Sequence, residues 1–330
     1  MNRTTLITAA ALALIAAAGI LFAGPLNPPA GPVTSTYKTL TEVEPRIAIN
    51  LTNTPGDANS LFKITQPGSY YLTGNITGVV GKHGIEIAAS NVTLDLNGFT
   101  LRGVVGSMDA VTAGLNGLEN IAVVNGTLSN WAGDGIDLAT NPVTSSRVER
   151  VLAKENNGSG IRTGFNGMIS YCASNLNGGN GITSNQGTVI INCSAYQNEG
   201  NGISAGSGTL VADCNARFNT QNGITASGGC VIRGNVCSNN GNDGIGAGIS
   251  VTGSDNRIED NNCTGADRGI EATASGNIFL RNTCGGNTTN WVIVANNRLL
   301  VVVPPVALAI SGSSGGTSLG STDPNANFSY

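Results

Sequence analysis

The chain has 330 residues and a formal net charge of −4, and only 11% of its residues are charged. An ordinary globular domain carries about 25% charged residues. Glycine accounts for 47 residues and aromatic residues for only 5%, which disfavours coiled coils and large helical domains because glycine is a poor helix former. The acidic balance also disfavours nucleic acid as a partner, since nucleic-acid-binding domains carry basic patches.

The N-terminal residues have the pattern of a secretory signal peptide, predicted over 1–23. Arg3 is the positive charge, Leu6 to Phe22 form an apolar run, and Ala23 is a small residue before the cleavage point. We therefore expect an exported protein, secreted or in the cell envelope, with no stable membrane insertion after cleavage. A retained membrane anchor is the alternative, because the apolar run reaches the short limit of a membrane span.

Residues 24–58 are predicted to form a proline-rich linker and an N-terminal cap. Within the cap, Tyr37 to Arg46 is expected to be a short amphipathic helix. A repeat fold needs such a cap, because its open end otherwise leaves strand edges and core in water.

A repeat of 21 residues dominates the middle of the chain. The pair Gly-Ile recurs in four steps of 21 residues from Gly160 to Gly244, and the pattern extends in steps of 21 to 26 residues back to Gly84 and on to Asn290. Two further columns, meaning residues at the same position of successive repeats, keep the period of 21. One column is asparagine: Asn156, Asn177, Asn198, Asn219 and Asn240. The other is mostly cysteine: Cys172, Cys193, Cys214 and Asn235.

A period of 21 residues is too short for two helices and their turns, which need about 33–34 residues in helical repeat arrays. Three short strands and three turns fit this length. We therefore predict an all-β fold, a single-stranded parallel β-helix of about ten coils over residues 59–300. Stacked coils place equivalent residues about 4.8 Å apart, so the asparagines form a hydrogen-bonded ladder at a turn. The isoleucines form an internal ladder: Ile85, Ile136, Ile161, Ile182, Ile203, Ile224, Ile245 and Ile270.

Residues 301–330 are predicted to form a C-terminal cap strand and a flexible tail. Trp291 replaces isoleucine in its column, as a wide lid on the last coil. The apolar run from Leu299 to Ile310 is interrupted by two prolines, which favours a capping strand over a membrane span. Residues 311–330 are rich in Gly, Ser and Thr and are expected to be mobile.

The seven cysteines are predicted to be mainly small buried side chains. Cys172, Cys193 and Cys214 stack in register at an inward position, and Cys237 lies on the same side of its strand. Disulfides between neighbouring coils, or between Cys230 and Cys237, are the first alternative. Soft-metal binding is the second.

The turns of successive coils, with "NEGNGI", "NTQNGI" and "NGNDGI", resemble the parallel β-helix repeats of the pectate-lyase-like superfamily. The segment "SNVTLDLNGFTL" from Ser90 to Leu101 is similar to an early coil of that fold. The resemblance covers residues 59–300 and implies a right-handed helix with three sheets. It does not specify an activity, because lyases, hydrolases, epimerases, phage tailspikes and non-catalytic surface proteins share this architecture.

The resemblance implies where an active site would be sought. Lyases of the superfamily bind Ca²⁺ through acidic clusters and abstract a proton with Arg or Lys. The nearest matches are the group Asp134, Asp137 and Arg162, and a second patch, Glu259-Asp260 with Asp267-Arg268. Calcium needs six to eight oxygen ligands, so these carboxylates make a weak case.

Other enzymes of the superfamily have motifs that this sequence lacks. It contains neither the three aspartates with Gly-His-Gly of polygalacturonases nor the Asp-Pro-His-Asp of alginate epimerases. The single histidine, His83, lies in a turn column and is interpreted as a polar turn residue. We assign no catalytic residue and no metal site.

One outward face combines aromatic rings, cations and amides. Because the cysteine column points inward, its neighbours point outward. Sugars bind such faces by ring stacking and hydrogen bonds, and a uronate carboxylate adds a partner for arginine. An ordinary solvated face is the alternative interpretation. The candidate carbohydrate-binding residues are Arg150, Lys154, Tyr171, Asn192, Tyr196, Asp213 and Arg217.

We therefore predict an exported, non-catalytic β-helix that binds extracellular or cell-surface polysaccharide or acts as a structural surface protein. The alternative is a polysaccharide lyase or glycoside hydrolase with a divergent active site. No cofactor is expected, except Ca²⁺ under the lyase alternative.

Overall fold

The computed structural model describes residues 44–241, 244–299, 302–303 and 323–330. Within these ranges every regular element is a β-strand and none is a helix. The predicted signal peptide 1–23, most of the linker and cap, and residues 304–322 lie outside the described residues. The predicted cap helix reaches into them only at 44–46, which are not helical.

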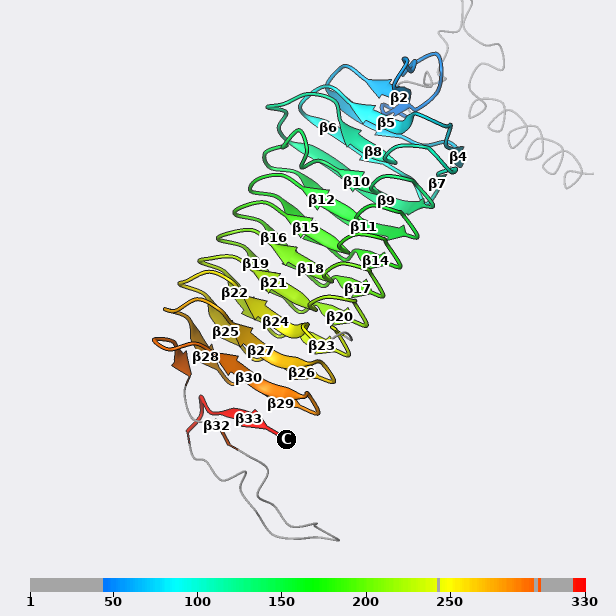
Figure 1. The fold of residues 1–330 in the computed structure, drawn as a ribbon. Coiled ribbons are helices and arrows are strands. Elements are labelled where there is room, and N and C mark those ends of the chain that lie inside the picture. Colours follow the sequence, from blue (N-terminus) through cyan, green and yellow to red (C-terminus); the bar gives the residue numbers. More distant parts are fainter. Residues whose placement is uncertain (1–43, 242–243, 300–301, 304–322) are drawn as a thin grey trace, which may run out of the picture. The chain divides into compact units, whose positions relative to one another are not determined.

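The strands from residue 46 onward stack as the coils of a parallel β-helix (Figure 1), which confirms the predicted fold. One wall of the stack, here called the first face, is a parallel sheet of 11 strands. These strands are β2 (Ser60–Ile64), β5 (His83–Ile87), β8 (Val111–Ala113), β10 (Ile136–Asp137), β12 (Ile161–Thr163), β15 (Ile182–Ser184), β18 (Ile203–Ala205), β21 (Ile224–Ala226), β24 (Ala247–Val251), β27 (Arg268–Ala272) and β30 (Thr289–Ile293).

The remaining strands form a 22-stranded sheet that is bent lengthwise into a second and a third face. The two strands that run through the bend are β9 (Ile121–Ser129) and β11 (Arg147–Lys154). The second face contains β1 (Ile47–Ala48), β3 (Gly68–Tyr71), β6 (Val92–Asp95), β13 (Met168–Ser170), β16 (Val189–Ile191), β19 (Leu210–Ala212), β22 (Val231–Arg233), β25 (Arg257–Glu259), β28 (Ile278–Leu280) and β31 (Arg298–Leu299).

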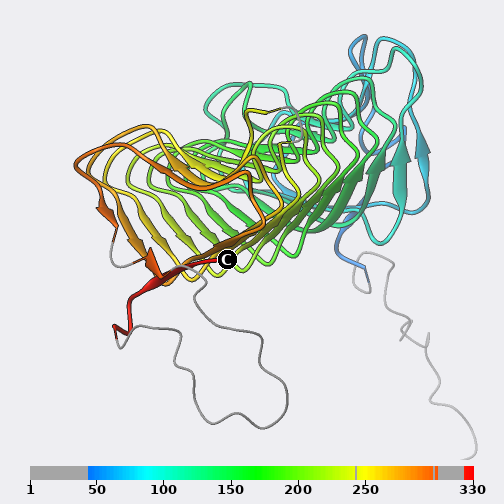
Figure 2. The same ribbon diagram turned by 60° about the horizontal axis from the view of Figure 1, so that its bottom comes forward.

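The third face contains β4 (Ile76–Thr77), β7 (Thr100–Arg102), β14 (Ala173–Asn175), β17 (Ser194–Tyr196), β20 (Asn215–Arg217), β23 (Val236–Ser238), β26 (Asn262–Thr264), β29 (Thr283–Gly285) and β33 (Asn327–Ser329). A short strand, β32 (Val302–Val303), pairs with β33. Figure 2, turned from the first view, shows the coils following one another along the stack.

The stack has about 12 turns, slightly more than the ten that the Gly-Ile repeat predicts. One of the additional turns lies at the N-terminal end, where β2 precedes the first Gly-Ile pair. Phe62 of β2 pairs with Ile85, so an aromatic side chain occupies the isoleucine column there. A search for Gly-Ile does not find this coil.

Isoleucine forms the predicted internal ladder, with one correction. Ile245 is 75% exposed, and Ile249 instead pairs with Ile224. The extra residues of this coil lie in the turn before β24. Gly244-Ile245 therefore lies in that turn, and Ile249 of Gly248-Ile249 occupies the isoleucine column. Eight isoleucines are fully buried in the column: Ile85, Ile136, Ile161, Ile182, Ile203, Ile224, Ile249 and Ile270.

The predicted asparagine ladder is confirmed at the turn after the third face. Asn177 donates from its backbone N and from Nδ2 to Oδ1 of Asn198, at 3.1 and 2.9 Å. Asn198 repeats this pattern with Asn219, and its Nδ2 also donates to the Ser174 carbonyl. Each buried side chain thus satisfies two backbone groups of the preceding coil and bonds to the side chain of the next asparagine, which offsets the cost of burying polar atoms.

A second asparagine ladder at the bend continues the cysteine column. The Cys214 backbone N donates to Asn235 Oδ1 at 3.0 Å, and Asn235 bonds in turn to Asn261. The thiol of Cys193 contacts the Ile169 carbonyl of the preceding coil at 3.6 Å, where Asn235 donates to the Val211 carbonyl at 3.0 Å. The thiol therefore occupies the place of an amide.

The seven cysteines are all buried and free, as the interpretation as small buried side chains requires. Disulfides, the first alternative, are not formed. Cys237, Cys263 and Cys284 pair in register as a second stack inside the third face.

The chain end differs from the expected mobile tail. In β33, Phe328 pairs with Thr283 of β29, so this segment completes the last coil of the third face. At the first face, Trp291 pairs with Ile270, as the column predicts.

Candidate functional site

The predicted carbohydrate-binding residues lie in two parallel columns. On the third face, Lys154 and Tyr196 both pair with Asn175, and Tyr196 pairs on with Arg217. The other four residues lie at the bend, where each has a left-handed backbone with φ between 53° and 55°: Arg150, Tyr171, Asn192 and Asp213.

A shallow hollow of about 460 Å³ lies at this bend, beside Arg150 and Tyr171. The Tyr171 side chain is 58% exposed, and the Arg150 guanidinium lies 5.9 Å from the centre of its ring. The hollow is lined in addition by Gly98, Asn125, Gly126, Thr127, Val151, Leu152 and Ala173. Arg150 also pairs with Glu149 at 2.5 Å, so its charge is partly balanced.

The bend conformation makes these two side chains unexpected. A left-handed backbone suits Gly, Asn and Asp, and other residues adopt it at a cost of about 1–2 kcal/mol. The same column holds Asn192, Asp213 and Gly234, which fit that conformation. Arg150 and Tyr171 occupy it at an energetic disadvantage that they share with Arg281 in the same column and with Leu176 and Phe218 elsewhere.

Tyr196 is less accessible than Tyr171, because it is half-buried. Its ring meets the edge of Phe218 at a centroid distance of 5.9 Å, and the Arg217 guanidinium lies 4.6 Å from the Phe218 centroid. Lys154 lies 3.6 Å from Glu155. Sequence reasoning missed Phe218, whose position next to Arg217 is the signal that would have found it.

The first face carries a row of ionisable groups on successive coils. Nδ1 of His83 accepts the backbone N–H of Asp109 at 3.2 Å, and Oδ1 of Asp109 accepts that of Asp134 at 2.7 Å. His83 is thus the first acceptor of a ladder along the strand starts. Nδ1 of His83 also lies 3.2 Å from Oδ2 of the Asp109 carboxylate.

Arg162 closes this row. As its column predicts, it pairs with Asp137 across β10 and β12, and its guanidinium lies 2.9 Å from Asp134 and 3.5 Å from Asp137. Burial raises the pKa of Asp134, although Arg162 opposes that shift. Burial also works against the Arg162 cation, but its bond to Asp134 and the charge of Asp137 raise the pKa of Arg162 overall.

These carboxylates do not fit a calcium site. Asp134 is engaged by Arg162 and by the Ser159 backbone N–H, and Asp137 caps the turn at Ala139. Across the described ranges, no group of three or more His, Cys, Asp or Glu is arranged to hold a metal ion.

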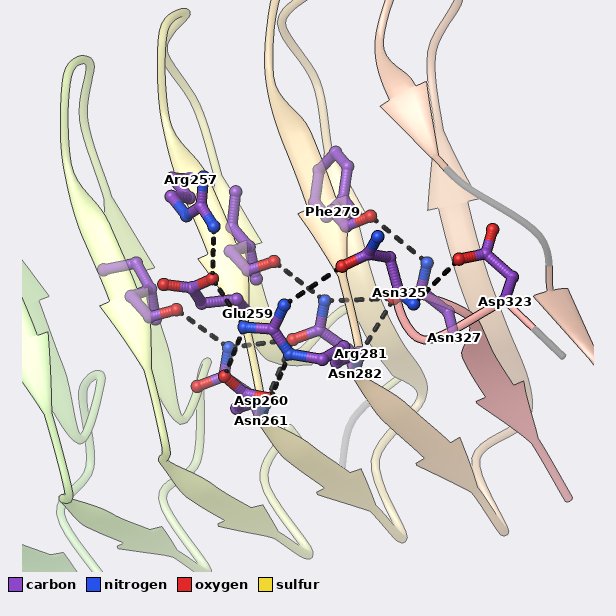
Figure 3. A network of polar contacts seen from close by, with 12 residues as sticks. Arg257, Glu259, Asp260, Asn261, Phe279, Arg281, Asn282, Asp323, Asn325 and Asn327 are labelled. Carbon is purple, nitrogen blue, oxygen red and sulfur yellow. Dashed lines mark hydrogen bonds and ion pairs between the residues drawn. The ribbon is translucent and has the colours of Figure 1, made fainter.

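The second acidic patch is an ion-pair network on the last coils (Figure 3). Arg281 bonds to both Glu259 and Asp260, and its Nη1 reaches Asn325 near the chain end. The other half of the predicted patch is separate, since Arg268 pairs with Glu271 at 2.8 Å. Both groups are internally paired, which suits a structural role.

Fold and surface together define a parallel β-helix protein with polar and aromatic groups arrayed in columns. No protein-family model matches the sequence, and no curated protein matches it. No helix in the described part of the chain is long and apolar enough to cross a membrane.

Solved structures share this fold. The A-module of mannuronan C-5 epimerase AlgE6 from Azotobacter vinelandii is similar over 77% of this chain and 86% of that chain, with a TM-score of 0.58 and 15% identity. The enzymatically active domain of tailspike protein 2 from bacteriophage CBA120 is similar over 75% of this chain and 51% of that chain, with a TM-score of 0.54 and 11% identity. Pectate lyase Pel9A is more distant, with a TM-score of 0.44 and 19% identity over 70% of this chain and 65% of that chain. The resemblance to pectate-lyase-like β-helix proteins is thus confirmed for the fold.

Proposed function

We propose that this chain is an exported, non-catalytic β-helix that binds an acidic extracellular or cell-surface polysaccharide at the bend and third face. The observation that carries the proposal is the hollow at the bend, where exposed Tyr171 stands beside Arg150 over an apolar floor. An aromatic ring and aliphatic side chains suit the C–H faces of sugars, and a guanidinium suits a uronate carboxylate. Export rests on the signal pattern of residues 1–23.

The structural neighbours support a polysaccharide as the partner class. The most similar of those named above is, by its name, an epimerase of mannuronan. If no glycan binds, the protein instead has a purely structural role at the surface.

The test replaces Tyr171 with asparagine, the residue that occupies the same bend position at 192. We expect Tyr171→Asn to keep or raise the melting temperature, because Asn suits a left-handed backbone, and to weaken glycan binding by about 1–3 kcal/mol. Isothermal titration with acidic and neutral polysaccharides measures the binding. The matched control is Leu176→Asn, which changes another exposed left-handed residue outside the hollow. Equal binding by Tyr171→Asn and the parent would refute the proposal.

A second candidate function is a polysaccharide lyase or hydrolase, favoured by the row of His83, Asp109, Asp134 and Arg162 on the first face. A carboxyl with a raised pKa suits proton donation. The discriminating assays follow absorbance at 235 nm, where unsaturated uronates absorb, and the release of reducing ends. Product formation that Asp134→Asn abolishes would favour this candidate over the non-catalytic one.

A further inference from the structure

A second and larger hollow, of about 640 Å³, lies at the opposite edge of the third face, where the strands turn toward the first face. Its polar lining comes mainly from Arg102 and Glu155, and its apolar lining from Val104 and Val105. The other residues around it are Thr77, Gly103, Asn130, Ala132 and Asn157. Arg102 is exposed and makes no ion pair within the described residues.

One loop of this hollow, which includes Gly103, Val104 and Val105, repeats the sequence of the loop one coil earlier. Gly-Val-Val-Gly occurs at residues 78–81 and again at 103–106, one coil later. The backbone N–H of Gly81 donates to the Gly106 carbonyl at 2.7 Å, so the two loops are stacked. Val80 is 68% exposed and Val105 is 95% exposed. Val105 thus places an exposed apolar side chain at the hollow that Arg102 also lines.

The hollow is in register with the candidate glycan site. Arg102 pairs with Ser129, and Ser129 pairs with Lys154, which begins the column that contains Tyr196 and Arg217. At about 4.8 Å per coil, Arg102 and Lys154 are about 10 Å apart along the stack, and Lys154 and Arg217 are about 14 Å apart. Three cations therefore follow one line across the third face.

We propose that the hollow at Arg102 is a second subsite of the glycan site, and that the ligand is a polyanionic polysaccharide lying along the coil stack. The inference rests on the proposed function, and it adds the ligand's direction, length and charge. The acidic groups of the ligand would bind Arg102, Lys154 and Arg217, while the valines of the stacked loops would contact its C–H faces. Glu155 next to Lys154 weakens the middle position, so the two arginines at the ends contribute most.

The length of this line makes the proposal testable. Five coil steps separate Arg102 from Arg217, which is about 24 Å at the inter-strand spacing. A disaccharide is too short to touch both arginines, whereas an octasaccharide is long enough. Affinity should therefore rise with the length of the oligosaccharide, and only the octasaccharide should lose affinity when Arg102 is replaced.

The experiment measures disaccharides and octasaccharides of galacturonate, mannuronate and heparin on the full chain by titration calorimetry. Arg102→Gln is expected to weaken octasaccharide binding about tenfold, the loss of one charge-assisted contact, and to leave disaccharide binding unchanged. Val105→Ser should act in the same direction, because it removes an exposed apolar wall without touching the core. Arg233→Gln, an exposed arginine on the second face, is the matched control and should bind like the parent.

The outcomes separate the two proposals. Loss of octasaccharide affinity in both Arg102→Gln and Tyr171→Asn supports the extended site. If Tyr171→Asn weakens binding while Arg102→Gln binds every length like the parent, the second subsite is wrong and the site at the bend stands. If none of the three polyanions binds the parent chain, the glycan site at the bend and its second subsite are both wrong, and a structural surface role is left.

Discussion

Asn282 donates from its backbone N and from Nδ2 to Oδ1 of Asn327, at 2.9 and 3.2 Å. These two residues are 45 positions apart, yet they bond like neighbours on the ladder that are 21 apart. Asn327 is fully buried and donates to the Phe279 carbonyl at 3.2 Å. Residues 323–330 therefore add a rung to the bend ladder, and Asn327 pairs backbone groups of Asn282 and Phe279.

The first prediction concerns this rung. Asn327→Ala should destabilise the fold by about 1–3 kcal/mol, because the buried backbone N of Asn282 loses its partner, while Nδ2 of Asn282 keeps its bond to the Ile258 carbonyl. Thermal unfolding followed by circular dichroism measures the change. Pro324→Ala, at an exposed position of the same segment, is the control and should change little. A melting temperature equal to the parent's in Asn327→Ala would contradict this role for the chain end.

The second prediction concerns pH and the network in Figure 3. Hydrogen bonding to Arg257 lowers the pKa of Glu259, and hydrogen bonding to Arg281 lowers the pKa of Asp260. Groups with a lowered folded-state pKa stabilise the fold above their unfolded pKa values, about 4, and this contribution disappears as the pH falls through the folded values.

Arg281→Gln should therefore lower the melting temperature at pH 7, and this deficit should shrink as the pH falls through the lowered folded-state pKa values of Glu259 and Asp260 and the carboxyls become protonated. The shift should be small, since Asp260 is half exposed and such pairs contribute about 0–1 kcal/mol. A deficit that stays the same over this pH range would show that Arg281 acts through Asn325 or through packing instead.

The third prediction uses two isoleucines that each follow a glycine. Ile249→Ala should cost about 2–5 kcal/mol, because Ile249 is fully buried between Ile224 and Ile270. Ile245→Ala should change stability by less than about 0.5 kcal/mol, because Ile245 is exposed. Chemical denaturation of the pair measures both values. A larger loss of stability in Ile245→Ala than in Ile249→Ala would show that Ile245, and not Ile249, occupies the isoleucine column.

The fourth prediction concerns the thiols. Burial raises the pKa of Cys230 and of Cys263, which keeps these side chains in the unreactive thiol form. We expect no thiol to react rapidly with Ellman's reagent in the native protein, and all seven to react after unfolding in guanidinium. The melting temperature should not depend on dithiothreitol. A reductant-sensitive melting temperature would indicate disulfides in place of the free thiol stacks.

The sequence by itself determined the repeat and its core. A coil of 21 residues returns every side chain to the same environment, so a buried position at Ile203 implies buried positions at Ile182 and Ile224. The same translation carries Asn198 onto Asn177. The 21-residue period can be recognised in the amino-acid sequence. This is why the fold, the asparagine ladder and the outward columns could be predicted from the residues alone.

Where a coil changes length, only the tertiary structure decided the outcome. The extra residues before β24 lie in the turn and leave Ile245 in water, and Asn327 joins the ladder at a separation of 45 residues, which is not the period of the repeat. The two hollows, the contact of Tyr196 with Phe218, and the bond of His83 to Asp109 also lay beyond the sequence. Each of these features depends on contacts between side chains of neighbouring coils. Those contacts are set by the loop conformation and by the side-chain rotamers, and neither of these follows the 21-residue repeat.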